Sequence, residues 1–394
     1  MAHPVKGAPA HDDIPLVAHV VYSFGCGGLQ TLLAECINRM LAAHYRHAII
    51  CLTPAKDYAD RIDRPDVVFH DLHKPPGNSI ATHVRLWRLL RRLRPAVLHT
   101  YNVGTIEYNA TAWLAGVPVR IHAEHGRDSV EIDGRHRRYN VLRRLLIPVV
   151  DAYVPVSNDL VDWLRGTVGI PEKKIAMVIN GVDTARYAPA PGPAAAPPTI
   201  WIGTVGRADR IKNHAGLLDI FERVLARFPG SEYDLRLAIV GDGPLLETLR
   251  SRVAAQAWGD RVWLPGARGD IAGLLRTFSV FVLPSLSEAS PVVVLEAMAS
   301  ALPVVASRVG GLPQLVLDGE TGALADATDV EAFADAIARY IRDPELRLAH
   351  GAAGRSHVQA GFSMDAMVAG YDALYSRHLA RKKRWPVLFR RLRA

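Results

Sequence analysis

Residues 280–296 read Val280-Phe-Val-Leu-Pro-Ser-Leu-Ser-Glu-Ala-Ser-Pro-Val-Val-Val-Leu-Glu296, a short apolar run followed by the features of a helix start. We predict that residues 280–283 form a buried strand, because a short apolar run bounded by turn residues is typical of a parallel sheet. Ser290 is suited to cap the next helix with its hydroxyl. Pro291 suits the first helical position, where a missing N–H costs nothing. The stretch therefore predicts one strand, turn and helix of an α/β sheet.

Two glutamates flank this predicted helix start. Glu288 comes just before it and Glu296 more than one turn later. The amides of Val292 and Val293 would point outward at the positive helix end, where anions, most often phosphate, bind. Carboxylates on both sides of a phosphate would accept hydrogen bonds from hydroxyl groups, as a nucleotide sugar requires. An ordinary surface helix that carries two acids is the alternative.

Short apolar runs alternate with amphipathic segments along the chain, the pattern of parallel strands joined by crossover helices. A proline-rich segment, residues 187–199, interrupts the pattern and is predicted to be a linker. Helices are expected at 29–43 and 83–93, and Ser157 is expected to cap another. The expected strands are 16–23, 47–52, 96–100 and 152–156 before the linker, and 200–205, 235–240, 262–264, 280–283 and 303–306 after it.

The 394 residues suffice for two domains with separate cores. We place the domains at residues 1–186 and 200–365, followed by a C-terminal segment at 366–394. Both are expected to be doubly wound α/β domains that face each other across a cleft. Ligands of such sheets bind beyond the carboxyl ends of the strands, so both domains would contribute to one site.

The composition is that of a folded protein, with 49% hydrophobic and 22% charged residues. No apolar run is long enough to span a membrane. The N-terminus reaches Asp12 and Asp13 before any apolar run, which is unlike a signal peptide, and the three cysteines lack metal-ligand spacing. We therefore expect a cytoplasmic protein with reduced thiols.

The net charge of +8 is concentrated in the C-terminal tail. From Arg377 onward there are eight cations and no acid, interspersed with apolar side chains. This pattern suits the surface of an anionic membrane, where each cation contributes about 1 kcal/mol. A solvated terminus is the alternative. Nucleic acid is not an expected partner, because the rest of the chain is near neutral and has no recognition motif. The helix expected at 83–93 is also basic, with Arg85, Arg88, Arg91 and Arg92.

Two cations, Arg207 and Lys212, follow the first strand of the second half. At the carboxyl end of a strand they could neutralise a diphosphate, although a surface pair of charges would look the same in sequence. Gly206 is expected to permit a tight turn before them.

The chain also contains an ordered series of motifs. In the second half these are Gly206-Arg207-x4-Lys212, Gly241-Asp-Gly-Pro244, Leu264-Pro-Gly266 with Asp270, Glu288-x7-Glu296 and Gly310-Gly-Leu-Pro-Gln314. In the first half they are Gly27-Gly28, Glu124-His125-Gly126, Val156-Ser157 and Asn180-Gly-Val-Asp183. The series covers nearly all of residues 16–375 and resembles the retaining glycosyltransferases of family 4.

This resemblance implies the GT-B fold, with two Rossmann-like domains. The first domain would bind the acceptor and the second the nucleotide sugar. The C-terminal helix would return to the first domain. The donor would be a UDP-sugar or a GDP-sugar, with no cofactor. No two aspartates are spaced Asp-x-Asp, the pattern by which many other glycosyltransferases hold a divalent ion, so no metal is expected.

The resemblance also implies roles for residues of the second half. Arg207 and Lys212 would bind the donor diphosphate and stabilise the departing nucleotide. Glu296 would accept hydrogen bonds from the ribose, and Glu288 from the transferred sugar. The segment that holds the phosphates would be Ser290, Pro291, Val292 and Val293.

Other implied contacts lie on both halves. Arg268, between Gly266 and Asp270, would contact the base. In the first half, Gly27 and Gly28 would let the backbone approach the diphosphate. His125 would lie near the sugar and the acceptor, although a histidine beside a glycine is often structural.

A narrower resemblance is to sugar transferases associated with exopolysaccharide and PEP-CTERM export loci. It rests on His19-Val-Val-Tyr22, Gly27-Gly28-Leu29, and His125-Gly-Arg-Asp128 with Asp133-Gly134. One departure from the family is Ala289, where many members have glycine. We expect its methyl group to tune sugar selection, and inactivation is the alternative.

The sequence thus predicts a cytoplasmic retaining hexosyltransferase. Its acceptor would be a hydroxyl of a growing glycan, predicted to be lipid-linked, at the inner face of the cell membrane. The alternatives are a sugar-nucleotide epimerase of related architecture, a non-catalytic scaffold, and a dinucleotide oxidoreductase. The last is suggested by Gly25-Cys-Gly-Gly28, but its third glycine is misplaced for Gly-x-Gly-x-x-Gly.

Overall fold

The computed structural model describes residues 14–25, 27–54, 59–127, 134–190, 199–230 and 233–383. The chain forms two compact units, unit 1 with residues 1–179 and 367–394, and unit 2 with residues 180–366. The domain limits expected from the sequence stay predictions, and residues 191–198 of the expected linker lie outside the described residues. Among the helices of the described segments, none has the length and apolar character needed to cross a bilayer.

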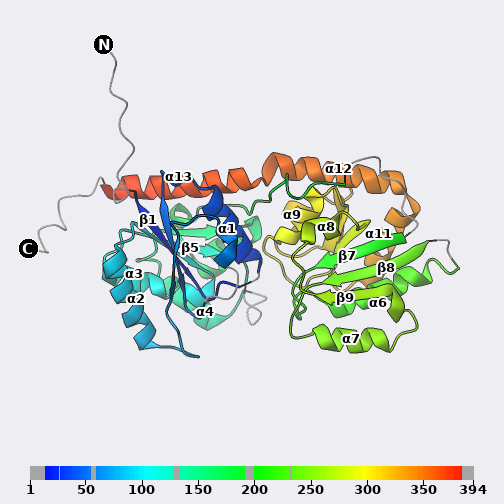
Figure 1. The fold of residues 1–394 in the computed structure, drawn as a ribbon, viewed down its shortest axis with the longest axis horizontal. Coiled ribbons are helices and arrows are strands. Elements are labelled where there is room, and N and C mark those ends of the chain that lie inside the picture. The colour runs from blue at the N-terminus through cyan, green and yellow to red at the C-terminus, as the bar shows by residue number, and fades with distance from the viewer. Residues whose placement is uncertain are drawn as a thin grey trace, which may run out of the picture. The chain divides into compact units, whose positions relative to one another are not determined.

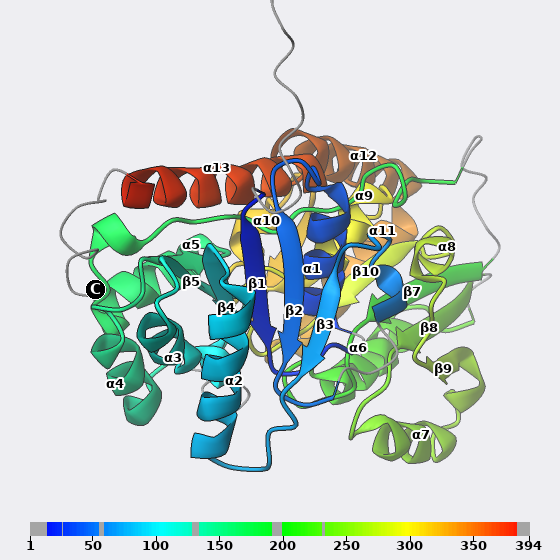
Figure 2. The ribbon, with the colours of Figure 1, turned by 60° about the vertical axis from the view of Figure 1, so that its left-hand side comes forward.

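Unit 1 is built on six parallel strands in the order β3-β2-β1-β4-β5-β6 (Figures 1 and 2). The chain winds outward in both directions from the central pair β1 and β4, as in a Rossmann-like sheet. The strands are β1 (Leu16–Val21), β2 (Arg46–Cys51), β3 (Val68–Asp71), β4 (Val97–Tyr101), β5 (Val119–Glu124) and β6 (Ala152–Pro155).

The helices of unit 1 begin where the sequence supplies capping groups. Ser79 accepts a hydrogen bond from the Thr82 amide at the start of α2, and Arg94 ends that helix in the left-handed conformation. Ser157 caps α5 by accepting from the Leu160 amide, as predicted. The helices are α1 (Gly28–Arg39), α2 (Ile80–Leu93), α3 (Tyr108–Ala115), α4 (Arg137–Leu145), α5 (Asn158–Asp162) and, from residue 367 onward, α13 (Met364–Lys383).

Two strands of this sheet, β3 and β5, are absent from the sequence-based prediction. β5 reads Val-Arg-Ile-His-Ala-Glu, yet all its residues are buried. Its polar side chains tolerate burial because they are paired, Arg120 with Asp151 at 2.9 Å and Glu124 with Arg143 at 2.7 Å. β3 is a four-residue edge strand with exposed and half-buried side chains, so it lacks an apolar run.

The C-terminal helix returns to unit 1, as the family resemblance predicts. From residue 367 onward, α13 belongs to this unit and runs alongside it (Figure 1). The Tyr375 hydroxyl lies 2.8 Å from Nδ1 of His99 on β4. The Tyr45 hydroxyl, just before β2, lies 2.8 Å from Oγ of Ser376. Polar contacts therefore attach α13 to strand β4 and to the segment just before β2.

Unit 2 repeats the same winding with six parallel strands, in the order β12-β11-β10-β7-β8-β9. β7 and β10 form its central pair. The predicted strand at 280–283 is confirmed as β10, whereas the edge strand β12 is absent from the prediction. The strands are β7 (Thr199–Val205), β8 (Asp234–Val240), β9 (Val262–Gly266), β10 (Val280–Leu283), β11 (Val304–Ser307) and β12 (Gly322–Ala325).

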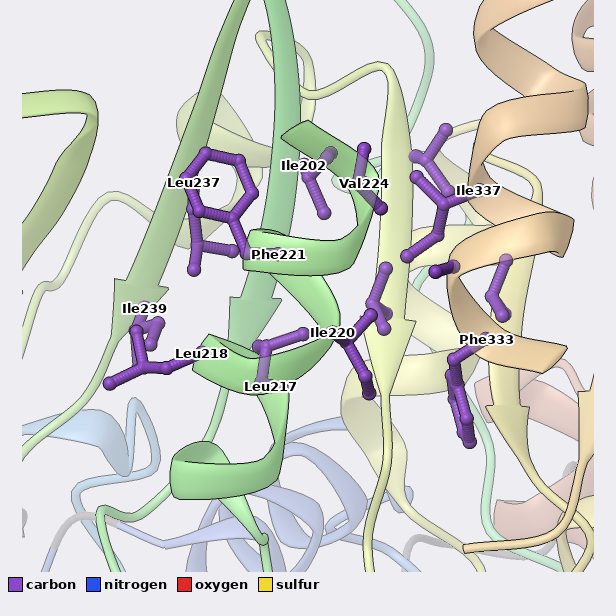
Figure 3. Packing of buried hydrophobic residues seen from close by; sticks show 14 of the residues in the cluster. Ile202, Leu217, Leu218, Ile220, Phe221, Val224, Leu237, Ile239, Phe333 and Ile337 are labelled. Atoms are coloured by element: carbon purple, nitrogen blue, oxygen red, sulfur yellow. The ribbon is translucent and has the colours of Figure 1, made fainter. Parts of the chain in front are cut away.

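Apolar side chains of α6 and α11 pack against one face of this sheet (Figure 3). Leu217, Phe221 and Val224 of α6 and Phe333 of α11 are almost completely buried. The hydrophobic residues of α6 recur every three or four positions, so burial of one face stabilises the helix. The helices of unit 2 are α6 (His214–Ala226), α7 (Leu246–Ala254), α8 (Ile271–Leu275), α9 (Val292–Ala299), α10 (Leu312–Leu315), α11 (Val330–Arg342) and α12 (Pro344–Gly361).

Gly203→Ala should destabilise unit 2. A Cβ at Gly203 on β7 would lie 2.0 Å from the Phe278 ring, and overpacking of a core typically costs about 1–3 kcal/mol. Thermal unfolding followed by circular dichroism measures the effect. Gly273→Ala in α8 is the matched control, because no atom lies within 4 Å of its added Cβ. Equal melting temperatures for the Gly203 variant and the wild type would contradict this packing.

Candidate functional site

The candidate site of unit 2 lies where the chain leaves β7 and β10, the central strands of the sheet. The loop after β7 and the loop after β10 are hydrogen-bonded to each other. The Leu286 amide donates to the Ile211 carbonyl at 2.8 Å, and the Asn213 side-chain amide donates to the Pro284 carbonyl at 3.1 Å. This is the point at which doubly wound sheets bind ligands.

Lys212 and Glu288 meet at this point. Lys212 Nζ lies 2.6 Å from Glu288 Oε1, and the two side chains are only 19% and 9% exposed. From the sequence these residues were expected to bind different parts of a ligand, and in the structure they contact each other. The contact places a cation and a carboxylate together in a sheltered position, where electrostatic interactions are stronger than in water.

The turn at Gly310 and Gly311 fixes the backbone of Glu288. The Gly311 amide donates to the Glu288 carbonyl at 3.0 Å. Gly310 has a φ of +53°, and a Cβ at this residue would lie 1.8 Å from the same carbonyl oxygen. Only glycine leaves room for this approach. The Gly-Gly-Leu-Pro motif therefore has a structural function that its sequence alone did not reveal.

The start of α9 differs from the prediction in two respects. Pro291 is the N-cap residue, with φ −68° and ψ 117°, and the helix itself begins at Val292. Ser290 does not cap the helix, and its buried Oγ has no hydrogen-bond partner in the protein. The reason is that Pro291 itself is extended, so the helix starts one residue later than predicted and Ser290 lies one position before the N-cap, where Asn180 Nδ2 donates to its carbonyl at 2.9 Å.

The predicted amides of Val292 and Val293 do occupy the first turn of α9. The first amides of a helix have no partner within it, so they remain available to an acceptor outside the helix. Glu296 lies one turn further along and is 7% exposed. Burial raises the pKa of its carboxyl to about 7, partly offset by a hydrogen bond from Tyr187 and by the charge of Arg186.

Arg207 lies on the loop after β7 with a largely exposed side chain, and its Nε is 3.9 Å from Asp209 Oδ2. The tight packing near this loop depends on Gly241 rather than on Gly206. Gly241 has a φ of +143°, and a Cβ there would lie 2.0 Å from the Gly206 carbonyl oxygen. A Cβ at Gly206 would meet the flexible Lys212 side chain at 3.4 Å. Glycine was expected to be required at position 206, but the structure requires it more strictly at position 241.

Several buried polar atoms of unit 2 have no partner in the protein, which is uncommon in folded structures. They include Oγ1 of Thr204 at the end of β7, both ring nitrogens of His214, and Oγ of Ser285 after β10. Burial, together with the charge of Lys212, lowers the pKa of His214 to about 4. These three residues are not among those predicted from the sequence. Thr204 and Ser285 lie at or just after the ends of predicted strands, which was the available signal for them, whereas His214 is the first residue of α6.

Arg268 and Asp270 form a separate feature on the loop after β9. Arg268 Nε and Nη2 contact the two Asp270 carboxylate oxygens at 2.9 and 2.8 Å, and both residues are exposed. The Arg268 guanidinium also lies 6.0 Å from the centre of the Trp263 ring. The proposed contact of Arg268 with a nucleotide base stays a prediction.

The candidate residues of unit 1 follow β1 and β5. Gly27 is the extended N-cap residue of α1, with φ −179°, and Gly28 is the first residue of that helix. A Cβ at Gly27 would lie 2.6 Å from the end of the Gln30 side chain. Cys26, Asp128 and Asp133 lie outside the described residues.

His125 follows β5, and its backbone amide donates to Asn102 Oδ1 at 2.8 Å. Both ring nitrogens are covered by the protein but have no hydrogen-bond partner there. Burial lowers the pKa of the ring to about 4, although the neighbouring Glu124 acts in the opposite direction. The ring also borders a cavity of about 10 Å³, next to Tyr101 and Tyr371.

The site residues thus fall into two groups, one in each unit. In unit 2 the structure brings Lys212 into contact with Glu288, just before the start of α9. Within the described segments, no group of three or more His, Cys, Asp or Glu side chains is arranged to hold a metal ion. The roles assigned to the individual residues remain predictions.

Glu296→Gln should stabilise the protein at high pH. The folded carboxyl has a pKa of about 7 against an ordinary value of 4.5, so it keeps a proton that the unfolded chain releases. Stability is therefore lost as the pH rises from about 4.5 through 7, at a cost on the order of 3 kcal/mol. Glutamine avoids this loss, because it does not ionise.

The melting temperature of the Glu296→Gln variant relative to wild type, measured at pH 5 and pH 8, tests this expectation. The gain should be larger at pH 8. Glu320→Gln is the control, because Glu320 is exposed. An equal gain at both pH values would show that ionisation of Glu296 does not limit stability.

Comparison with known proteins gives a family for each half of the chain. Residues 26–186 match the family model described as Glycosyltransferase Family 4. Residues 199–343 match the model described as Glycosyl transferases group 1. One match covers most of unit 1, and the other covers the sheet and most helices of unit 2.

Individual relatives agree with these matches. The chain is 34% identical over 392 residues to the D-inositol 3-phosphate glycosyltransferase of Pseudarthrobacter chlorophenolicus, covering 90% of this chain and 92% of the relative. It is 28% identical over 284 residues to the UDP-Gal:alpha-D-GlcNAc-diphosphoundecaprenol alpha-1,3-galactosyltransferase of Escherichia coli, covering 67% and 71% of the two chains.

Among solved structures, Anabaena Alr3699/HepE in complex with UDP and glucose is similar to this chain with a TM-score of 0.78. The match covers 91% of this chain and 99% of that chain, at 17% identity, and shows a common fold. The two Rossmann-like units, together with this structural similarity, show that the protein has the GT-B fold. The chain belongs to the family 4 glycosyltransferases.

Proposed function

We propose that this protein is a retaining, metal-independent hexosyltransferase of exopolysaccharide or cell-surface glycan synthesis, of the kind associated with PEP-CTERM loci. It would transfer a hexosyl unit from a nucleotide-diphosphate sugar to a hydroxyl of a lipid-linked glycan. The observation that carries the proposal is the Lys212–Glu288 pair just before the start of α9. The pair provides a cation and a carboxylate beside amides that are free to bind phosphate.

Donor binding would separate this pair. A diphosphate at the amides of Val292 and Val293 attracts the Lys212 ammonium, because charge-assisted contacts to phosphate are strong. Glu288 then accepts hydrogen bonds from hydroxyls of the hexosyl unit. Arg207 adds a second cation, and Glu296 accepts from the ribose.

The relatives support a nucleotide-sugar donor and a lipid-linked acceptor. The Escherichia coli relative is named for UDP-Gal and for an acceptor linked to diphosphoundecaprenol. The Anabaena structure contains UDP and glucose. We propose the same classes of donor and acceptor for this chain, with UDP or GDP as the nucleotide.

In the proposed reaction, the bond between the sugar carbon and the donor phosphate oxygen breaks as the acceptor oxygen attacks from the same face. The departing phosphate oxygen takes the proton of the acceptor hydroxyl. Lys212 and Arg207 stabilise the negative charge that develops on this leaving group. His125, whose low pKa keeps its ring neutral at pH 7, offers one donor and one acceptor to sugar hydroxyls. No protein residue forms a covalent bond to the sugar.

Two other functions predict different products. An epimerase would convert the donor without an acceptor, and a non-catalytic scaffold would release no nucleotide. Ala289, the departure from the family pattern, is 8% exposed, so its methyl group is packed into the protein. We propose that this methyl group shapes the pocket for the sugar.

Glu288→Ala should reduce transfer at least about 100-fold, because a hydrogen-bond acceptor for the transferred sugar is lost. The assay measures nucleotide diphosphate released with and without acceptor, using the donor that gives the largest thermal shift in a panel of UDP- and GDP-sugars. Glu320→Ala, an exposed glutamate of the same unit, is the control. The control should keep wild-type turnover.

Three results would count against the assignment. Near-normal turnover of Glu288→Ala would refute the role of that residue. Conversion of the donor without acceptor would favour the epimerase, and absence of turnover with every donor would favour the scaffold.

An exposed stripe on α2 supports a membrane-bound acceptor. Ile80, Val84 and Trp87, spaced four and three residues apart, are 84%, 41% and 41% exposed. This spacing places them on one face of the helix. Trp113 and Leu114 of the neighbouring α3 are also exposed. The four arginines of α2 are exposed as well, so apolar and cationic side chains together suit an anionic membrane surface.

Replacing Arg85 and Arg88 of α2 by glutamine should weaken binding to anionic vesicles about 30-fold, because each of the two cations contributes about 1 kcal/mol. Sedimentation with phosphatidylglycerol vesicles, compared with phosphatidylcholine vesicles, measures this change. Arg261→Gln with Arg339→Gln, two exposed arginines of unit 2, is the control. If both double variants bind like the wild type, α2 is not a membrane contact.

The basic tail requires a separate variant that ends at Lys383. Residues 384–394 lie outside the described residues. A cut at residue 376 would also remove buried His378 and Lys382, which lies 3.0 Å from Asp151. The shorter truncation therefore tests the tail without disturbing α13. Equal binding of the full chain and this truncation to anionic vesicles would rule out a role of residues 384–394.

A further inference from the structure

Asn102, the residue after β4, has an unusual backbone conformation. Its φ of 57° and ψ of 171° lie in a region that is essentially restricted to glycine. Other non-glycine residues with positive φ, such as Arg94 and Asn213, have the ordinary left-handed values that end or cap helices. The chain therefore places asparagine at a position whose backbone favours glycine.

Hydrogen bonds around the turn hold this conformation. The Asn102 amide donates to the Ala123 carbonyl on β5 at 2.8 Å, and the Thr105 amide donates to the Asn102 carbonyl at 3.1 Å. The buried Oγ1 of Thr105 accepts from the Tyr101 amide at 2.7 Å and donates to the Tyr101 carbonyl at 2.7 Å. The turn is thus secured by backbone groups and by Thr105, without the side chain of Asn102.

The Asn102 side chain acts on the next strand. Its Oδ1 accepts the hydrogen bond from the His125 amide at 2.8 Å. His125 follows directly after β5, so this bond links the ends of two adjacent strands. The contact determines where the backbone of His125 lies as it leaves the sheet.

The ring of His125 depends on this backbone contact, because its nitrogens make no hydrogen bond within the described protein. The ring is in contact with Tyr101, at a centroid distance of 5.8 Å and an angle of 46°. A tilted aromatic contact limits the ring position but does not direct its nitrogens. The backbone position of residue 125 therefore sets where those nitrogens can meet a ligand.

We propose that Asn102 is a positioning residue for sugar transfer. Its side-chain oxygen holds the backbone of His125 so that the two ring nitrogens, which are buried without a hydrogen-bond partner in the protein, can meet hydroxyl groups of the sugar or acceptor when the substrates bind. This inference rests on the proposed function, in which His125 lies at those hydroxyls. It explains why asparagine occupies a position where glycine would fit with less strain.

Two substitutions at this position separate the hydrogen bond from the backbone strain. Asn102→Gly relieves the strain but removes the oxygen, so we expect an unchanged or higher melting temperature and a kcat about 100-fold lower. Asn102→Asp retains an oxygen at the same position, so it should keep kcat within about threefold of wild type. The KM for the donor should change little in both variants, since Lys212, Arg207 and Glu296, which we propose bind the donor nucleotide, lie in unit 2.

A second measurement does not depend on turnover. Hydrogen exchange of the His125 amide should be at least about tenfold faster in Asn102→Gly than in wild type, and unchanged in Asn102→Asp, because only glycine leaves the amide without its acceptor. A merely structural role of this bond would predict a lower melting temperature for Asn102→Gly, with the kcat of the folded variant close to that of the wild type.

The outcomes distinguish failure of this inference from failure of the proposed function. Wild-type kcat in Asn102→Gly, equal loss in both variants, or an unchanged exchange rate in Asn102→Gly would overturn the positioning role. A fully active His125→Ala variant would also overturn it. If the wild-type protein transfers no sugar, the proposed function itself is wrong.

Discussion

Close contact between backbone segments at the carboxyl ends of the strands is the constraint on which the site of unit 2 depends. The turn after β8 meets the turn after β7, where a Cβ on Gly241 would overlap the Gly206 carbonyl. The turn after β11 meets the turn after β10, where a Cβ on Gly310 would overlap the Glu288 carbonyl. Each glycine lets one loop support its neighbour, so the loops that carry Lys212 and Glu288 are held by the rest of the sheet edge.

This support places charged and polar groups where solvent is partly excluded. Lys212 and Glu288 compensate each other's charge, whereas the Tyr187 hydrogen bond and the charge of Arg186 only partly offset the burial of Glu296, and the pKa of its carboxyl rises to about 7. Thr204, His214 and Ser285 leave buried polar atoms without protein partners. Such groups reduce stability unless a ligand satisfies them, and this cost is typical of binding sites. The same edge of the sheet therefore carries buried polar atoms without protein partners and is suited to a polar ligand.

The sequence predicted those features that depend on local pattern. The apolar runs correctly predicted the central strands of both sheets. The order of the motifs correctly predicted the family and the GT-B fold. Strand β5 escaped detection because Arg120 and Glu124 look solvent-exposed until their partners, which are distant in sequence, are known. For the same reason the Lys212–Glu288 contact was not expected, since 76 positions separate the two residues. The prediction that Ser290 caps α9 was wrong because the helix starts one residue later, at Val292, and Ser290 is held instead by a tertiary contact of its carbonyl with Asn180.

In each unit, a contact from a neighbouring loop fixes the backbone of a candidate site residue, but the contacting groups differ. In unit 2, glycine allows a carbonyl of the preceding loop to approach an amide, and this fixes Glu288. In unit 1, the loop after β4 fixes His125 through the side chain of Asn102. A glycine contact orients only the backbone that it touches, but a side-chain contact adds a hydrogen-bond acceptor at the cost of a strained conformation. This strain is understandable if the position of His125 matters to the reaction, because a turn that only joined β4 to the next helix could use glycine with less strain.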